Sequence, residues 1–153
     1  MRELLHLKLH HVCVTEANVQ YEGSFGIDRE IMNKVGLYNF EAIEIYNITN
    51  GARLKTYAIP LPAGSKRFES NGAAAHLVRK GDCIILASYA QFTDAALQKF
   101  KGPMIALMDF PKNTIKKLYQ PDRQKADGSG PLEEFDTLQH GRDRNLALHP
   151  TWI

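Results

Sequence analysis

Long apolar runs and cysteines are scarce in this sequence, and their scarcity excludes several classes of protein. No stretch approaches the roughly 20 apolar residues that a membrane-spanning helix needs, and residues 1–9 lack the apolar core of a signal peptide. The two cysteines, Cys13 and Cys83, lie inside apolar segments, which favours buried free thiols. Their spacing gives no support to a disulfide, although it leaves one open. We therefore expect no membrane association and a reducing, cytoplasmic setting.

An excess of charge of one sign is also missing. Lysine and arginine number 19 against 17 acidic residues, a net charge of +2, which is too small to indicate a nucleic-acid partner. A basic run at Lys112, Lys116 and Lys117 is typical of a solvated surface. Metal-ligand spacings are absent too: His10 and His11 are adjacent, and adjacent strand residues point to opposite faces. We expect no metal.

The apolar residues that are present form many short segments separated by turns. A chain of 153 residues is long enough for one domain with a core of its own. Short strands with few small helices are typical of a closed β-barrel. The predicted strands are 4–14, 41–48, 53–59, 83–89 (central and buried) and 104–110, and the predicted short helices are 27–35, 73–78 and 92–100.

Local signals mark the ends of these elements. Asp28 is the expected cap or first-turn acid of the first helix, and Gly36 is expected to end it. Asn50-Gly51 predicts a two-residue hairpin turn, because both residue types tolerate a positive φ. Thr93 or Asp94 is the expected cap of the last helix.

The C-terminal part of the chain has no sustained period. From about residue 119 prolines and glycines interrupt a polar segment. The interpretation is a barrel over 1–118 and an irregular C-terminal extension over 119–153, with Trp152 anchoring its end.

Four polar motifs stand out against the apolar pattern. They are Lys8-Leu9-His10, Tyr21-Glu22-Gly23-Ser24, Arg53-Leu54-Lys55-Thr56-Tyr57, and Asn71-Gly72-Ala73-Ala74-Ala75-His76. Each residue has an ordinary explanation when taken singly: a loop serine, a strand threonine, an aromatic at the edge of the core, or a turn. Only their joint occurrence indicates a site.

A Gly-Ser pair can also be a site of self-cleavage. The Ser24 hydroxyl would attack the Gly23 carbonyl and turn the amide into an ester, a step that needs a strained or specifically held loop. A donor must polarise the carbonyl, and glycine allows backbone geometries that a Cβ forbids. β-Elimination then leaves dehydroalanine, and hydrolysis of dehydroalanine gives a pyruvoyl group and ammonia. The products would be chains of 23 and 130 residues (153 − 23 = 130).

In their order and residue types the four motifs resemble the pyruvoyl-dependent aspartate decarboxylases, over about residues 8–110. The resemblance implies a mainly β fold, a double-psi β-barrel, and a homotetramer with sites between subunits. It implies a carbon–carbon lyase that converts L-aspartate to β-alanine and carbon dioxide for pantothenate biosynthesis. The covalent pyruvoyl group derived from Ser24 would be the cofactor, and a maturation factor could assist the cleavage.

The resemblance also implies roles for individual residues. Ser24 matches the pyruvoyl precursor, Gly23 the residue before the cut, and Thr56 the threonine that assists the cleavage. Tyr57 matches the proton donor. The positions that match residues of the substrate pocket are Arg53, which holds the substrate carboxylate, Lys8, Tyr46, Asn71, Gly72, Ala73 and Ala74.

Two departures from the family pattern bear on the substrate. Tyr46 stands where relatives carry tryptophan, and Phe25 follows the serine where a small residue is common. Decarboxylation of another amino acid, such as glutamate, is therefore an alternative hypothesis. A third hypothesis, from a different class, is an uncleaved barrel that binds a ligand and catalyses nothing.

Overall fold

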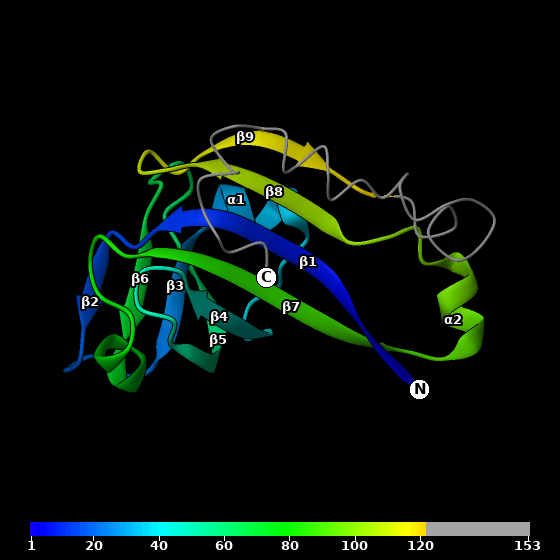
Figure 1. Ribbon diagram of the computed structural model, residues 1–153, viewed down its shortest axis with the longest axis horizontal. Coiled ribbons are helices and arrows are strands. Elements are labelled where there is room, and N and C mark those ends of the chain that lie inside the picture. Colours follow the sequence, from blue (N-terminus) through cyan, green and yellow to red (C-terminus); the bar gives the residue numbers. More distant parts are fainter. Residues whose placement is uncertain (122–153) are drawn as a thin grey trace.

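The computed structural model describes residues 1–121 of the chain. The predictions for the extension beyond residue 121, including Trp152, lie outside these residues. The strands are β1 (Arg2–Cys13), β2 (Glu16–Asn18), β3 (Ser24–Asp28), β4 (Ala42–Asn47), β5 (Arg53–Leu61), β6 (Phe68–Asn71), β7 (Cys83–Phe92), β8 (Met104–Asp109) and β9 (Thr114–Tyr119). Figure 1 shows β1, β7 and β8 as long neighbouring strands, with β2, β3 and β6 at one end of the molecule.

The nine strands form one sheet in the order β2-β6-β3-β5-β4-β7-β1-β8-β9. Strands from both halves of this order contribute to a single apolar core, for example Phe68 on β6 and Ala106 on β8, both fully buried. The sheet therefore curls around its core. The prediction of a mainly β fold is confirmed, and the arrangement is consistent with a double-psi β-barrel.

Three short helices connect the strands. They are α1 (Arg29–Val35), the 3-10 helix η1 (Gly72–His76) and α2 (Asp94–Lys99). The predicted caps are confirmed: Asp28 accepts from the Glu30 N–H, Gly36 adopts a left-handed φ of 77°, and Thr93 caps α2. The prediction that the first helix begins at Ile27 is wrong, because Ile27 belongs to β3 and is buried in the core.

The Asp28 carboxylate does more than cap α1. It also accepts from the N–H groups of Gly64, at 2.9 Å, and Lys66, at 2.7 Å, in the loop between β5 and β6. Three backbone donors on one carboxylate satisfy a buried charge. Asp28 thus fixes the C-terminal end of β3, the strand that begins at Ser24.

Some local predictions were incomplete. The hairpin between β4 and β5 is confirmed, but its turn has four residues, 48–51, because the Asn47 N–H donates to the Ala52 carbonyl. The Gly51 N–H donates to the Asn47 carbonyl, and Gly51 has a φ of 78°. The sequence pattern also missed the short strands β2 and β6 and the last strand, β9.

His10 and His11 do not obey simple alternation. The register of β1 on β7 shifts between Leu9 and Val12, and His11 has a φ of 64°. Both histidines are buried, and their ring centroids lie 4.0 Å apart. The expectation that they point to opposite faces is wrong, because a bulge interrupts the pleat at this point.

Candidate active site

The strand register brings several of the predicted site residues to one face of the sheet. Lys8 on β1 pairs with Ala87 on β7, which pairs with Glu44 on β4. Glu44 in turn pairs with Lys55 on β5. Leu9 on β1 and its β7 partner Leu86 point into the core. Because side chains alternate along a strand, the row that starts at Lys8 points to the other face of the sheet.

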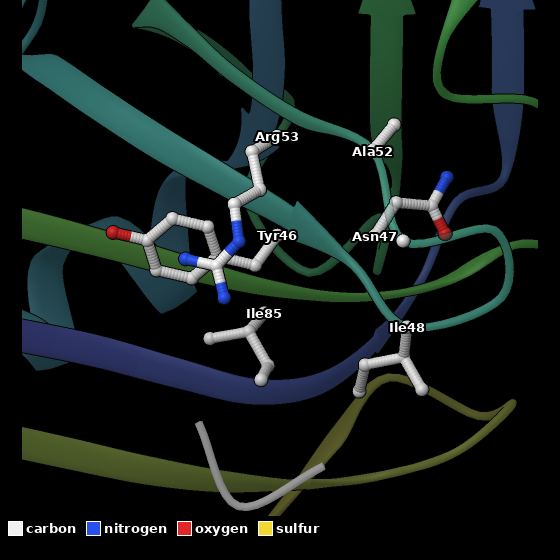
Figure 2. Close-up of a pocket in the computed structure, with 7 residues that line it drawn as sticks. Tyr46, Asn47, Ile48, Ala52, Arg53 and Ile85 are labelled. Atoms are coloured by element: carbon white, nitrogen blue, oxygen red, sulfur yellow. The ribbon is translucent and has the colours of Figure 1, made fainter.

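The next pair of β4 and β5 residues on this face consists of two residues matched to the substrate pocket, Tyr46 and Arg53. They are direct cross-strand partners, and Tyr46 also pairs with Ile85 on β7. The Arg53 guanidinium carbon lies 4.4 Å from the centre of the Tyr46 ring. Figure 2 shows the guanidinium over the ring and the Tyr46 hydroxyl pointing away from the hairpin turn. This cation–π contact leaves the guanidinium edges open to a carboxylate.

A small hollow of about 70 Å³ lies beside this pair. The strand residues Tyr46, Arg53 and Ile85 line it, together with residues of the hairpin turn. Within residues 1–121, no carboxylate lies within ion-pairing distance of Arg53. The site therefore presents a positive group that is held on an aromatic face and is not neutralised by any carboxylate of the described residues.

The Tyr46 hydroxyl contacts two other polar groups. It donates to a Glu44 carboxylate oxygen at 3.0 Å and lies 2.9 Å from the Tyr89 hydroxyl. Burial raises the pKa of Tyr46, and the hydrogen bonds with Tyr89 and Glu44 raise it further. The phenol therefore stays protonated, and it remains a donor, at physiological pH.

Lys8 adds a second positive group to the same face. Burial lowers the pKa of its ammonium group. In the described part of the chain no carboxylate forms an ion pair with Lys8. An anionic ligand would therefore gain more from Lys8 than from a fully solvated lysine.

The predicted cleavage bond lies at the start of β3. Ser24 is the first residue of that strand, pairs with Asn71 on β6 and is only 2% exposed. Its φ is 119°, a value that residues with side chains rarely adopt. Its hydroxyl has no hydrogen-bond partner among residues 1–121. A buried, unpartnered hydroxyl in a strained residue is unusual and is found at functional sites.

The Gly23 carbonyl, which precedes this bond, receives a hydrogen bond. The Tyr57 hydroxyl donates to it across 3.3 Å. Thr56, the residue matched to cleavage, pairs with Ile43 of the core-facing row and points to the opposite side of β5 from Tyr57. The structure thus brings Tyr57, and not Thr56, to the carbonyl in the uncut chain.

Gly72 packs directly against the cleavage segment. It has a φ of 66°, and a Cβ at this position would lie 2.9 Å from the Gly23 Cα and 3.1 Å from the Tyr21 carbonyl oxygen. Only glycine allows this approach. Asn71, before it, and Ala74, after it, are buried, whereas Ala73 is exposed. Part of the Asn71–Ala74 motif therefore forms a wall behind Gly23.

The predicted site residues fall into two clusters in one chain. Arg53 and Tyr57 share a face of β5 but lie four residues apart, roughly 13 Å at the rise of a strand. Neither Ser24 nor Tyr57 lines the hollow beside Arg53. Phe25, the second departure from the family pattern, is fully buried in the core.

The residues around Ser24 fit a pyruvoyl group made from that serine. The hydroxyl has no partner among the residues that the structure describes, the preceding carbonyl has a donor, and a glycine leaves room beside the bond. No cluster of three or more histidine, cysteine or acidic side chains suited to a metal ion occurs in the described residues.

Sequence reasoning missed two residues that contact the Tyr46 hydroxyl, Glu44 and Tyr89. Glu44 lies two residues before Tyr46 on β4, so alternation alone places both on one side. Tyr89 could not be found in this way, because its place beside Tyr46 depends on the pairing of β4 with β7.

Among the described residues, no helix has both the length and the apolar character that crossing a membrane requires.

Comparisons with known proteins indicate the family of the chain. A family model described as aspartate decarboxylase matches residues 1–116. Proteins named aspartate 1-decarboxylase are similar to the chain. The one from Alcanivorax borkumensis is 46% identical over 69% of this chain and 84% of its own length. The one from Caulobacter vibrioides is 44% identical over 74% and 95%, and that from Acaryochloris marina is 41% identical over 75% and 87%. The chain therefore belongs to the aspartate decarboxylase family.

Proposed function

We propose that this protein is a lyase that decarboxylates L-aspartate to β-alanine and carbon dioxide, after self-cleavage between Gly23 and Ser24. The observation that carries the proposal is the Ser24 hydroxyl, which is buried and has no partner within residues 1–121, in a residue with a φ of 119°. The relatives named aspartate 1-decarboxylase support the choice of substrate. β-Alanine made in this way would serve pantothenate biosynthesis.

The residues around the bond would drive the cleavage. Strain at Ser24 raises the energy of the uncut backbone, and no competing hydrogen bond from the described part of the chain holds the hydroxyl. Negative charge that grows on the Gly23 oxygen would be stabilised by the Tyr57 hydroxyl, already 3.3 Å away. Thr56 stays a proposed helper of the cleavage, and it would need a rearranged loop to reach the carbonyl.

After cleavage the new N-terminus would carry the pyruvoyl group, whose ketone supplies an electron sink for loss of carbon dioxide from an amine-bearing substrate. Arg53 and Lys8 would bind the carboxylates of aspartate, the arginine with two parallel N–H groups. Asn71, Gly72, Ala73 and Ala74 would line the wall near Gly23. Tyr57 would then donate a proton to the decarboxylated carbon.

A homotetramer with sites shared between subunits belongs to the same proposal. The separation of roughly 13 Å along β5 between Arg53 and Tyr57 supports it, because two clusters from different subunits could face one substrate. Co-expression of an Arg53→Ala chain with a Ser24→Ala chain tests it. Activity in the mixed oligomer, with none in either parent, is the expected result, and no activity in the mixture would contradict shared sites.

The experiment that tests the main proposal is an intact mass spectrum of the purified protein under denaturing conditions, followed by a substrate panel. We expect two chains divided at Gly23-Ser24, the longer without a free amine, and carbon dioxide released from aspartate. A single 17.3 kDa chain that stays uncut after warming, and after addition of a cell extract as a source of a maturation factor, would support the uncleaved binding barrel instead.

Glutamate is the second candidate substrate. Tyr46 favours testing it, because this residue stands beside the carboxylate-binding arginine and shapes the hollow. Release of carbon dioxide from glutamate but not from aspartate would replace the proposed substrate.

A reducing, cytoplasmic setting also remains a proposal. Cys13 and Cys83 are direct partners across β1 and β7, and both thiols are free and half-buried. Burial raises the pKa of both, which slows the thiolate chemistry that oxidation requires.

A further inference from the structure

The hydroxyl groups beside Arg53 form an ordered chain. Tyr46 has a single hydroxyl proton, and it points to the Glu44 carboxylate at 3.0 Å. The Tyr89 hydroxyl, 2.9 Å from the Tyr46 oxygen, must therefore act as the donor in their contact. The direction of donation runs from Tyr89 through Tyr46 to Glu44.

These two hydrogen bonds hold the hydroxyl end of the Tyr46 ring from two sides. Glu44 lies two residues before Tyr46 on the same strand, and Tyr89 reaches it from β7. The ring therefore has little freedom to swing along the sheet. The face of the ring carries the Arg53 guanidinium at 4.4 Å, so the place of the ring sets the place of the arginine.

Nothing else described holds the Arg53 head group. Residues 1–121 provide no ion pair for it, and no hydrogen bond from its guanidinium occurs there. A mobile arginine would lose side-chain entropy on binding a carboxylate, whereas a pre-positioned one loses less.

We propose that Tyr89 and Glu44 are positioning residues that fix the Tyr46 ring, and through it Arg53, for recognition of the substrate carboxylate. The inference rests on the proposed function of Arg53. The cleavage bond at Ser24 lies in the other cluster.

The test compares Tyr89→Phe, Tyr46→Phe and the double variant with the mature wild-type protein. Each variant keeps the ring and removes one hydroxyl. Because a hydrogen bond of this kind is worth only a small factor, we expect each single change to raise KM for aspartate about three- to tenfold and leave kcat within about twofold. KM of the double variant should be no higher than that of the more impaired single variant, because both hydroxyls belong to the same series of hydrogen bonds.

Succinate supplies a readout without turnover, since it has two carboxylates and no amine. Its Kd, measured by calorimetry, should rise in parallel with KM in both single variants. Tyr38→Phe is the matched control: Tyr38 is 77% exposed, and its hydroxyl has no hydrogen bond in the described structure. That variant should match wild type in KM, Kd and cleavage.

The inference would be overturned by unchanged KM and Kd in Tyr89→Phe, by a fall in kcat with KM unchanged, or by effects that add in the double variant. Failure of the proposed function would be recognised separately, in the wild-type protein, as an uncut chain or a lack of carbon dioxide from aspartate. Wild type that is active on aspartate but binds succinate no better than Arg53→Ala would also overturn the inference.

Discussion

The start and the middle of β5 are built in opposite ways. At the start of the strand the Tyr46 ring carries Arg53, and the Tyr46 hydroxyl is satisfied on both sides. Beside Tyr57, the middle residue of the strand, Ser24 has a strained φ and a buried hydroxyl without a partner in residues 1–121. A satisfied cluster suits repeated binding, whereas a strained one suits a reaction that happens once. The proposed recognition and the proposed maturation thus use different parts of one strand.

The largest effect is expected at the strained cluster around Ser24. Ser24→Ala removes the attacking hydroxyl, so we expect a single 17.3 kDa chain in a denaturing mass spectrum and no decarboxylase activity. Ser70→Ala is the control, because the Ser70 hydroxyl is likewise buried and without a partner in the described residues. Its cleavage should be normal. Activity that survives in Ser24→Ala would rule out a pyruvoyl mechanism.

Gly72→Ala tests whether close packing holds the scissile bond. The new Cβ would lie 2.9 Å from the Gly23 Cα and displace that segment, and a displacement near 1 Å can cost about a hundredfold in rate. We expect cleavage, followed by gel electrophoresis over time, to slow by about that factor.

The control for this change is Gly51→Ala. Gly51 has a φ of 78°, close to the 66° of Gly72, but no atom of residues 1–121 lies within 4 Å of the Cβ it would gain. Both variants therefore carry a similar backbone cost, and only one pushes on the cleavage segment. Equal cleavage rates in the two variants would mean that the contact with Gly23 plays no part.

Arg53→Lys should affect the satisfied cluster of Arg53 and Tyr46 alone. The lysine keeps the charge but loses the flat group that stacks on Tyr46 and binds a carboxylate with two N–H groups. We expect kcat/KM for aspartate to fall about ten- to hundredfold while cleavage is complete. Lys55→Ala, on the same face of β5, should change kcat/KM by less than about threefold. An uncut Arg53→Lys chain would show that the two clusters are not independent.

The smallest effect is a shift in pH dependence. Because burial lowers the pKa of the Lys8 ammonium, Lys8 loses its charge at a lower pH than an ordinary lysine. Affinity for succinate should therefore weaken as the pH rises through that lowered pKa, by about three- to tenfold. Lys8→Gln should bind weakly at every pH and lack this limb. An identical alkaline limb in the variant would assign it to another group.

Much of the strand pattern could be predicted from the sequence. The alternation over β4 and β5 and the apolar run of β7 are local signals, and so are the caps Asp28 and Thr93. Phe25 shows the limit of such reasoning, because only the pairing of β3 with β5 and β6 tells which side of β3 faces the core. β9 was missed because its polar residues give no clear strand pattern, and the strand is defined by its pairing with β8.

The residues of the candidate site were predicted through a resemblance to a family. Their contacts with one another could be found only from the folded structure. The sequence placed Arg53 and Tyr57 on one face of a strand, which the register agrees with. It could not indicate that Tyr57 reaches the Gly23 carbonyl, or that Tyr89 reaches Tyr46, because both contacts join strands far apart in the chain. The bulge at His11 likewise depends on how β1 pairs with β7.

The position of β1 in the sheet determines whether unfolding of the mature protein can be reversed. β1 pairs with both β7 and β8, and it gives Leu7, Leu9 and Val12 to the core. Under the proposed cleavage, this strand belongs to a separate 23-residue peptide that is held without a covalent link. Unfolding of the mature protein then becomes a dissociation, and recovery depends on protein concentration. A matured sample that is denatured and diluted should not regain its fold, whereas the uncut Ser24→Ala chain should.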